Sequence, residues 1–369
     1  MSKETVNIGV NMHNRFDFKV RTLPSWYRMF PRGWWPRIRK ILDIFPFKFS
    51  WLWGRVTSTA EAENIVLTQL YPKLVTALTG TSGYPVQTNT MGYVHLGSGT
   101  TTPAASQTQL TTLVRALASS FNSSTPNTNN MGVTIVRIGT VDAGVGIGEV
   151  YREVGFASSA GGTTLNTRAL IKDGNGDPLT ITKADLQVVT ITGTWYCNLV
   201  NNYGPNFGCP GTWPGGTGTC IATTAGWAWL WGAQVINGVN NAVRSSAFRM
   251  RVGSSGTAVA PSNNVAVLAA NAWGSNALTV TGDAGNARVT WSIRVPSTVS
   301  GTIKEFGFEC DFYNPGYSGS VTAVPIFRFI LPIGNNAPDY NNIYATDNIV
   351  KNSTNVIDVA LVLQFGSPA

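Results

Sequence analysis

The sequence has few of the residues that most enzyme chemistry requires. Charged residues make up only 12% of the 369 residues, about half of the usual share of roughly 25%. There are two histidines, His13 and His95, and neither lies in a motif for a nucleophile or a zinc ligand. We therefore expect a protein that is not an enzyme and that needs neither a cofactor nor a metal.

Long hydrophobic runs are also missing. No stretch approaches the ~18 apolar residues that a membrane-spanning helix needs. The first ten residues, MSKETVNIGV, contain no apolar signal core. Glycine is abundant instead, with 39 residues, beside many Thr, Ser and Asn. Such a composition is typical of short strands joined by tight turns.

One alternating segment suggests the fold. In residues 288–310, Val289, Trp291 and Ile293 alternate with polar residues, and a turn rich in Pro, Ser and Gly follows. After the turn the alternation resumes. This pattern predicts an antiparallel hairpin with one buried face, in which Trp291 is a core residue.

The same segment occurs earlier in the chain, at residues 133–156. An offset of 156 residues places Val133 on Val289 and also Gly97 on Gly253. Further along, Glu153-Val-Gly-Phe matches Glu305-Phe-Gly-Phe. A repeat of this length indicates that each copy is a folding unit of its own.

We therefore predict a mainly β fold of two tandem, internally duplicated antiparallel β-sandwich-like domains, with a few short helices and an extended N-terminal arm. The predicted parts are a basic, aromatic anchor arm over residues 1–57, a first β-domain over 58–196 with helices near 59–71 and 106–121, an excursion rich in Cys, Gly and Trp over 197–241, and a second β-domain over 242–369.

The N-terminal arm carries all of the net charge of +8. Ten basic residues between Arg15 and Arg55 stand against Asp17 and Asp43, and the rest of the chain is balanced. Arginines and tryptophans interleave, and four prolines exclude one long helix. The residues predicted to bind a partner are Arg28, Arg32, Trp34, Trp35, Arg37, Arg39, Lys40, Trp51 and Trp53.

Three partners would suit such an arm. Trp and Arg are enriched at interface hot spots, which favours an anchor in a larger protein assembly. Clustered basic and aromatic residues can also bind phosphates and stack on bases, so nucleic acid is the second choice. A membrane interface is the third, because the prolines disfavour a surface helix.

The four cysteines do not have zinc-ligand spacing. Cys209 and Cys220 could close a disulfide across the excursion, and two free thiols are an equal alternative. Cys310 has the spacing of a small apolar core residue beside Phe308.

Residues 93–103, YVHLGSGTTTP, resemble a recurring opening in tailed-bacteriophage structural proteins. The segments that commonly follow it there are present as Glu153-Val-Gly-Phe, Arg168-Ala-Leu and Ile181-Thr-Lys. The resemblance covers roughly residues 90–195. It implies a virion component that contacts other virion proteins and itself as a homo-oligomer.

From these features we expect a non-enzymatic bacteriophage virion protein of the tail, neck or an appendage, anchored by its arm. A capsid decoration or minor capsid protein is the alternative in the same class. A receptor- or glycan-binding adhesin is the alternative in a different class, with the Trp-rich stretch at 197–231 as its binding surface.

Overall fold

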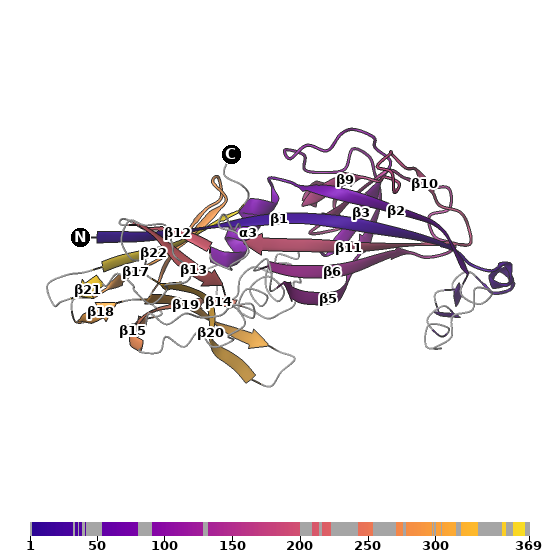
Figure 1. Cartoon of the computed structure of the whole chain (residues 1–369). Helices are drawn as coiled ribbons and strands as arrows, with labels where there is room; N and C mark the ends of the chain where they lie inside the picture. Colours follow the sequence, from indigo (N-terminus) through magenta and orange to yellow (C-terminus); the bar gives the residue numbers. More distant parts are fainter. Residues whose placement is uncertain are drawn as a thin grey trace.

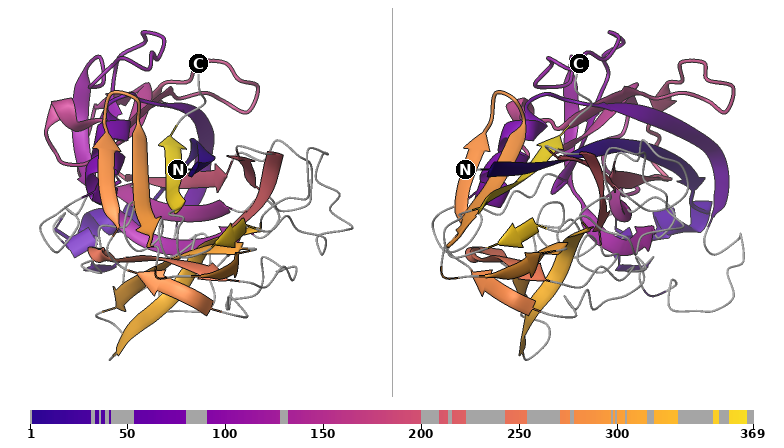
Figure 2. Two further views of the ribbon diagram at one scale, coloured as in Figure 1. Left: turned by 90° about the vertical axis from the view of Figure 1, so that its left-hand side faces the viewer. Right: turned by 60° about the vertical axis from the view of Figure 1, so that its left-hand side comes forward.

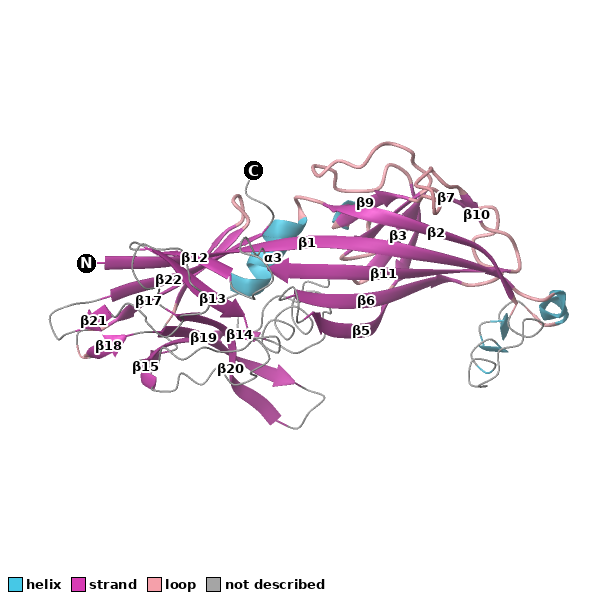
Figure 3. Ribbon diagram, in the orientation of Figure 1, coloured by secondary structure: helices cyan, strands magenta, loops and turns pink. Residues whose placement is uncertain are grey.

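A computed structural model describes the following residues: 2–31, 34–35, 37–38, 41, 54–79, 91–127, 132–199, 209–213, 216–222, 243–253, 271–275, 278–296, 298, 300–303, 305–314, 319–330, 349–351 and 357–365. The predicted β class is confirmed, since strands dominate and most of them belong to one large, nearly closed antiparallel sheet (Figures 1, 2 and 3).

The strands of the first half are β1 (Ser2–Thr22), β2 (Arg55–Val66), β3 (Tyr93–Gly97), β4 (Leu113–Ala118), β5 (Ser120–Asn127), β6 (Gly132–Val141), β7 (Val150–Tyr151), β8 (Glu153–Ala157), β9 (Thr167–Leu170), β10 (Ile181–Thr182) and β11 (Gln187–Leu199). One α-helix, α3 (Leu70–Thr79), follows β2.

The strands of the second half are β12 (Cys209–Trp213), β13 (Gly216–Ala222), β14 (Val243–Gly253), β15 (Asn271–Ser275), β16 (Thr279–Asp283), β17 (Arg288–Val295), β18 (Gly301–Ile303), β19 (Glu305–Asn314), β20 (Gly319–Ile330), β21 (Ile349–Lys351) and β22 (Ile357–Phe365).

Strand β1 is the centre of the fold. Its residues 10–22 pair antiparallel with β11, and residues 14–22 also pair antiparallel with β2. Its first residues, 2–10, pair with β22 in parallel. One strand therefore belongs to the sheet of both halves, and it runs the length of the molecule in Figure 1.

Among the described strands, those of the second half pair in the same order as those of the first, except that β22 pairs with β1 and not with β12. β3 pairs with β4 and β8, and β14 pairs with β15 and β19. β6 pairs with β5 and β11, and β17 pairs with β16 and β22. The pairs β8–β9, β7–β10 and β2–β9 correspond to β19–β20, β18–β21 and β13–β20.

The register of these pairs agrees as well. His95 stands opposite Gly155 across β3 and β8, and Arg251 stands opposite Gly307 across β14 and β19. His95 and Arg251 are separated by the offset of 156 residues that the sequence repeat predicts. The alignment of the two segments is thus matched by backbone pairing.

Strand β9 and its counterpart give a second example. Ile65 of β2 stands opposite Arg168 of β9, and Ile221 of β13 stands opposite Arg328 of β20. Ile65 and Ile221 are again 156 residues apart. The agreement in register therefore extends to β13, which lies in residues 197–241, the stretch predicted to be an excursion between the domains.

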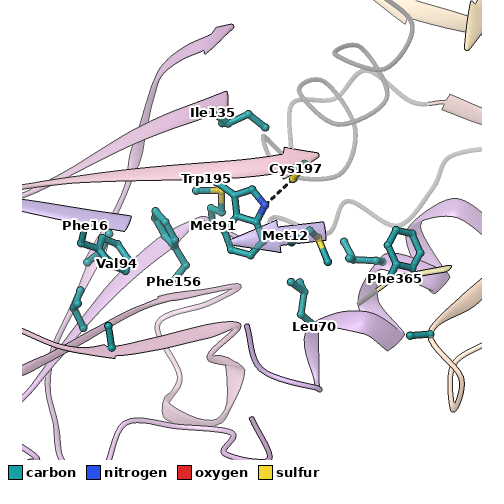
Figure 4. Close-up of a cluster of buried hydrophobic side chains, with 14 of the residues drawn as sticks. Met12, Phe16, Leu70, Met91, Val94, Ile135, Phe156, Trp195, Cys197 and Phe365 are labelled. Atoms are coloured by element: carbon teal, nitrogen blue, oxygen red, sulfur yellow. Dashed lines mark hydrogen bonds between the residues drawn. The ribbon is translucent and has the colours of Figure 1, made fainter. Parts of the chain in front are cut away.

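A single hydrophobic core runs through both halves. Phe16, Phe156 and Trp195 pack together in the first half, and Trp291 packs on Phe308 in the second, with ring centroids 5.1 Å apart. Helix α3 contacts β16 and β17, and its Leu70 joins the two regions (Figure 4). Trp291 is 1% exposed, which confirms the prediction that it is buried.

Both predicted helices are wrong. Residues 59–66 belong to β2, in which Ala60 and Ala62 are buried while Glu63 is exposed, so the segment alternates as a strand does. The helix follows later, as α3. Residues 106–112 form turns, and residues 113–118 form β4. Pairing in the sheet here outweighs the helical spacing of the apolar residues.

The predicted hairpins are also wrong, although the alternation of β17 is confirmed. β17 pairs with β16 and β22, whereas β19 pairs with β14 and β20. β6 and β8 are separated in the same way. Strand periodicity identifies a buried face, but it does not identify the neighbouring strand.

The N-terminal boundary differs from the prediction too. Residues 15–22 lie inside β1 and residues 55–57 lie inside β2, so they are part of the sheet rather than of an arm. Their basic side chains are on the sheet surface: Arg15, for example, forms ion pairs with Asp17 and Glu61. The arm is reduced to residues 23–54.

Candidate interaction surface

Residues 23–54 form an excursion at the tip of the hairpin of β1 and β2, which we call the tip excursion. Thr22 and Arg55 are the last paired residues before it. Gly54 closes it with φ of +79°, and a Cβ there would lie 2.2 Å from the carbonyl oxygen of Thr22. Only glycine fits such a position. The tip excursion projects from the end of the molecule opposite the N-terminus (Figure 1).

The base of the tip excursion is folded onto the sheet. A short 3-10 helix, η1 (Ser25–Met29), follows Pro24. Tyr27 and Trp35 are buried with Ala143 and Val188, and the Tyr27 and Trp35 rings meet edge to face at 6.5 Å. The indole Nε1 of Trp35 donates a hydrogen bond to the carbonyl of Phe30 at 3.0 Å. This small core holds the excursion in place.

Beyond this core, large apolar side chains are exposed. Met29 is 76% exposed, Ile41 is 59% exposed and Trp34 is 56% exposed. Val145 and Ile147, on the neighbouring loop before β7, are exposed as well. Apolar groups that gather on one surface usually mark an interaction site.

The tip excursion is also basic. Residues 23–54 contain Arg28, Arg32, Arg37, Arg39, Lys40 and Lys48 against a single acidic residue, Asp43. Arg28 and Arg37 are exposed. Arg28 forms one long ion pair of 3.9 Å with Asp185, which orients it without burying it. The surface therefore combines positive charge with exposed apolar groups.

Four of the nine predicted partner-binding residues lie in the described part of the tip excursion. Arg28, Trp34 and Arg37 are exposed as the prediction requires. Trp35 is 3% exposed and belongs to the internal core, so its assignment to a partner is wrong. Arg32, Arg39, Lys40, Trp51 and Trp53 lie outside the described residues.

The loop before β7 and the strands β4 and β7 carry a cluster of ionisable groups. Arg115 donates two hydrogen bonds to Glu149, and the hydroxyl of Tyr151 donates a third at 2.7 Å. The hydrogen bonds from Arg115 lower the pKa of Glu149. Burial lowers the pKa of Lys183 to about 8. These contacts join β4 and β7 to the loop that carries Val145 and Ile147.

The YVHLGSGTTTP motif belongs to a different site, inside the protein. Glu153 and Arg168 form an ion pair of 2.7 Å with both side chains fully buried. The carboxylate accepts hydrogen bonds from the backbone N–H of Gly99 at 3.0 Å and of Thr112 at 3.1 Å. Arg168 donates to the carbonyl of Thr101 at 2.9 Å.

Sequence reasoning missed this role for Glu153 and Arg168. The signal was present, because both residues stand in otherwise apolar strands and two glycines precede them in the motif. A Cβ on Gly97 or Gly99 would lie within 2.6 Å of the Glu153 side chain. The motif is thus an internal lock that fixes its own loop, and it presents no reactive group to solvent.

Cys209 and Cys220 stand opposite each other in the register of β12 and β13. The tryptophans at 227–231, on which the adhesin alternative depends, lie outside the described residues. In the described part of the chain no helix is long and apolar enough to cross a membrane, and no three metal-binding side chains gather there. The chain matches no family model, no curated protein and no solved structure.

Proposed function

We propose that this chain is a non-enzymatic structural protein of a bacteriophage virion, in the tail, neck or an appendage, and that the tip excursion anchors it to other virion proteins. The observation that carries the proposal is the exposure of Trp34, Met29 and Ile41 on a strongly basic segment. The motif resemblance of residues 93–103 supports the virion assignment.

The partner surface would be acidic and would contain apolar pockets. Trp34 and the arginines are the residue types that dominate binding energy at interfaces. Exposed arginines such as Arg28 and Arg37 would steer the chain toward negative charge. With six basic residues against one acidic residue, the tip excursion carries +5 of the net charge of +8, so this attraction is concentrated at one end of the molecule.

We further propose that residues 2–199 and 209–365 are two copies of one unit, a finer form of the predicted duplication. The repeated pairing order and the constant offset of 156 residues support it. In the second copy β12 and β13 are joined by Pro214 and Gly215 alone. The tip excursion is then an insertion in the first copy only, as expected of an acquired attachment segment.

The experiment replaces residues 23–54 by Asn-Gly. Thr22 and Arg55 already face each other, and a two-residue Asn-Gly loop is a favoured connection of antiparallel strands. Deleting residues 1–57 instead would remove β1 from the core. We expect the shortened chain to keep its circular dichroism spectrum and to be absent from purified particles, as measured by quantitative mass spectrometry.

A matched control is Phe121→Ala, which removes an exposed aromatic side chain from β5, away from the tip excursion. This variant is expected to enter particles normally. Normal incorporation of the shortened chain would overturn the anchor. If that chain also lost salt-dependent binding to DNA, the nucleic-acid alternative would replace it.

A further inference from the structure

The hairpin of β12 and β13 places two cysteines at one register position. Cys209 stands opposite Cys220, and the pairing continues from there to Trp213 opposite Gly216. Residues directly opposite in an antiparallel pair have Cα atoms about 4.5 or 5.5 Å apart. Both separations lie within the range of roughly 4.4–6.8 Å that a disulfide requires.

The first half has a different pair of residues at the register position that corresponds to Cys209 and Cys220. Across β1 and β2 the corresponding pair is Asn14 opposite Asn64, since Asn64 and Cys220 are 156 residues apart. The Nδ2 of Asn14 lies 3.3 Å from Oγ1 of Thr167, and the Nδ2 of Asn64 lies 3.1 Å from the same atom. The two amides therefore converge on one point inside the sheet.

That hydrogen-bonded link cannot be repeated in the second half. Thr167 stands opposite Val66, and the residue opposite the counterpart of Val66, Ala222, is Phe327. Phenylalanine offers no hydroxyl to accept hydrogen bonds. The second half therefore has no hydroxyl at this register position, and two cysteines stand in register where the first half has two asparagines.

The other two cysteines are unsuitable partners. Cys197 is buried in the first-half core, where the indole N–H of Trp195 donates to its sulfur at 2.7 Å (Figure 4). Cys310 lies on β19, which is separated from β13 by β20. Strands two positions apart in a sheet are about 10 Å apart, beyond the reach of a disulfide.

We infer that Cys209 and Cys220 are joined by a disulfide that closes the β12–β13 hairpin. The oxidant is a low-molecular-weight disulfide. One cysteine thiolate attacks a sulfur of that disulfide and releases one small thiol, and the second thiolate then attacks the mixed disulfide and releases the other. The protein loses two hydrogen atoms, and the oxidant gains them as two thiols.

The test is thiol mapping of the full chain. The protein is equilibrated in a buffer of oxidised and reduced glutathione, unfolded, alkylated without reductant and digested. We expect one linked peptide pair containing Cys209 and Cys220, with Cys197 and Cys310 alkylated. Alkylation of Cys209 and Cys220 after this treatment, or linkage of either to another cysteine, would overturn the inference.

A stability measurement distinguishes a disulfide that stabilises the fold from one that forms by chance oxidation. Reducing the disulfide should lower the melting temperature of the chain by roughly 3–5 °C. The Cys209→Ser/Cys220→Ser variant should melt at that lower temperature and be insensitive to reductant. The matched control, Cys310→Ser, should keep the sensitivity. An equal response of the double variant to reductant would contradict the assignment.

Discussion

Arg168 and Glu153 form a salt bridge 2.7 Å long in a region that solvent does not reach. Removing one partner of a buried pair leaves an uncompensated charge, which typically costs ~3–5 kcal/mol. We expect Glu153→Gln and Arg168→Met each to lower the free energy of unfolding by about that amount, as measured by urea denaturation.

The control for the buried pair is the exposed pair of Arg294 and Asp358, in which the nitrogen and oxygen atoms are also 2.7 Å apart. Exposed pairs contribute little to stability because water screens the two charges, so Arg294→Met should change the stability little. Equal losses for Arg168→Met and Arg294→Met would show that burial of the first pair is unimportant.

A second lock is expected at the matching position of the second half. Glu305 stands opposite Gly253 as Glu153 stands opposite Gly97, and Arg328 corresponds to Arg168. In a double-mutant cycle, Glu305→Gln and Arg328→Met should couple by ~0.5–3 kcal/mol. Combining Glu305→Gln with Arg294→Met should give additive losses instead, and additivity in both cycles would exclude the second lock.

Gly155 is held against its neighbouring strand, since a Cβ there would lie 1.9 Å from the carbonyl oxygen of Thr167. Gly155→Ala should therefore destabilise the fold by ~1–3 kcal/mol or more, because the backbone must move. Gly174→Ala is its matched control: no atom lies within 4 Å of that Cβ, and a change within ~0.5 kcal/mol is expected. Thermal melting of both variants compares them directly.

Acid should destabilise the protein through His95. Burial lowers its pKa below the ordinary 6.5, so the unfolded chain takes up this proton more readily than the folded one. The contribution of His95 is fully present above about pH 6.5 and is lost as the pH falls below it, by up to ~1.4 kcal/mol per pH unit. His95→Gln should flatten this dependence.

The pH dependence can be assigned by comparing the two histidines. Partial burial also lowers the pKa of His13, but Glu63 opposes this shift, and much of the residue is still exposed to solvent. His13→Gln should leave most of the acid sensitivity in urea-denaturation curves between pH 5 and pH 7. An unchanged slope in His95→Gln would assign the sensitivity to other groups.

The sequence predicted the β class and the alternation of β17 well, because these depend on local periodicity. Strand partners were not predicted, since the polar turn after Val295 resembles a hairpin turn although β17 and β19 lie in different sheets. The stretch 59–66 was misread because Ala and Glu favour helices and only its tertiary pairing makes it a strand.

The sequence indicated the basic and aromatic character of the tip excursion but not its boundaries. The charge count identified the basic aromatic segment, but it included residues 15–22 and 55–57, whose basic side chains decorate the sheet. Trp34 and Trp35 are neighbours with opposite environments, one 56% exposed and the other 3% exposed. Composition treats the two alike, and only the packing of Tyr27 separates them.

Because β1 pairs with strands of both halves, it limits the order in which strand pairs can form during synthesis. Ser2 is paired with Ile357, so residues 2–10 have their partner in a strand that is translated ~350 residues later. This strand pair cannot form until residues 357–365 have left the ribosome. Residues 2–10 must wait, exposed as an unpaired strand, while ~350 residues are added. Aggregation through this unpaired strand would then limit the yield of the folded protein, and a chaperone that covers it would raise the yield.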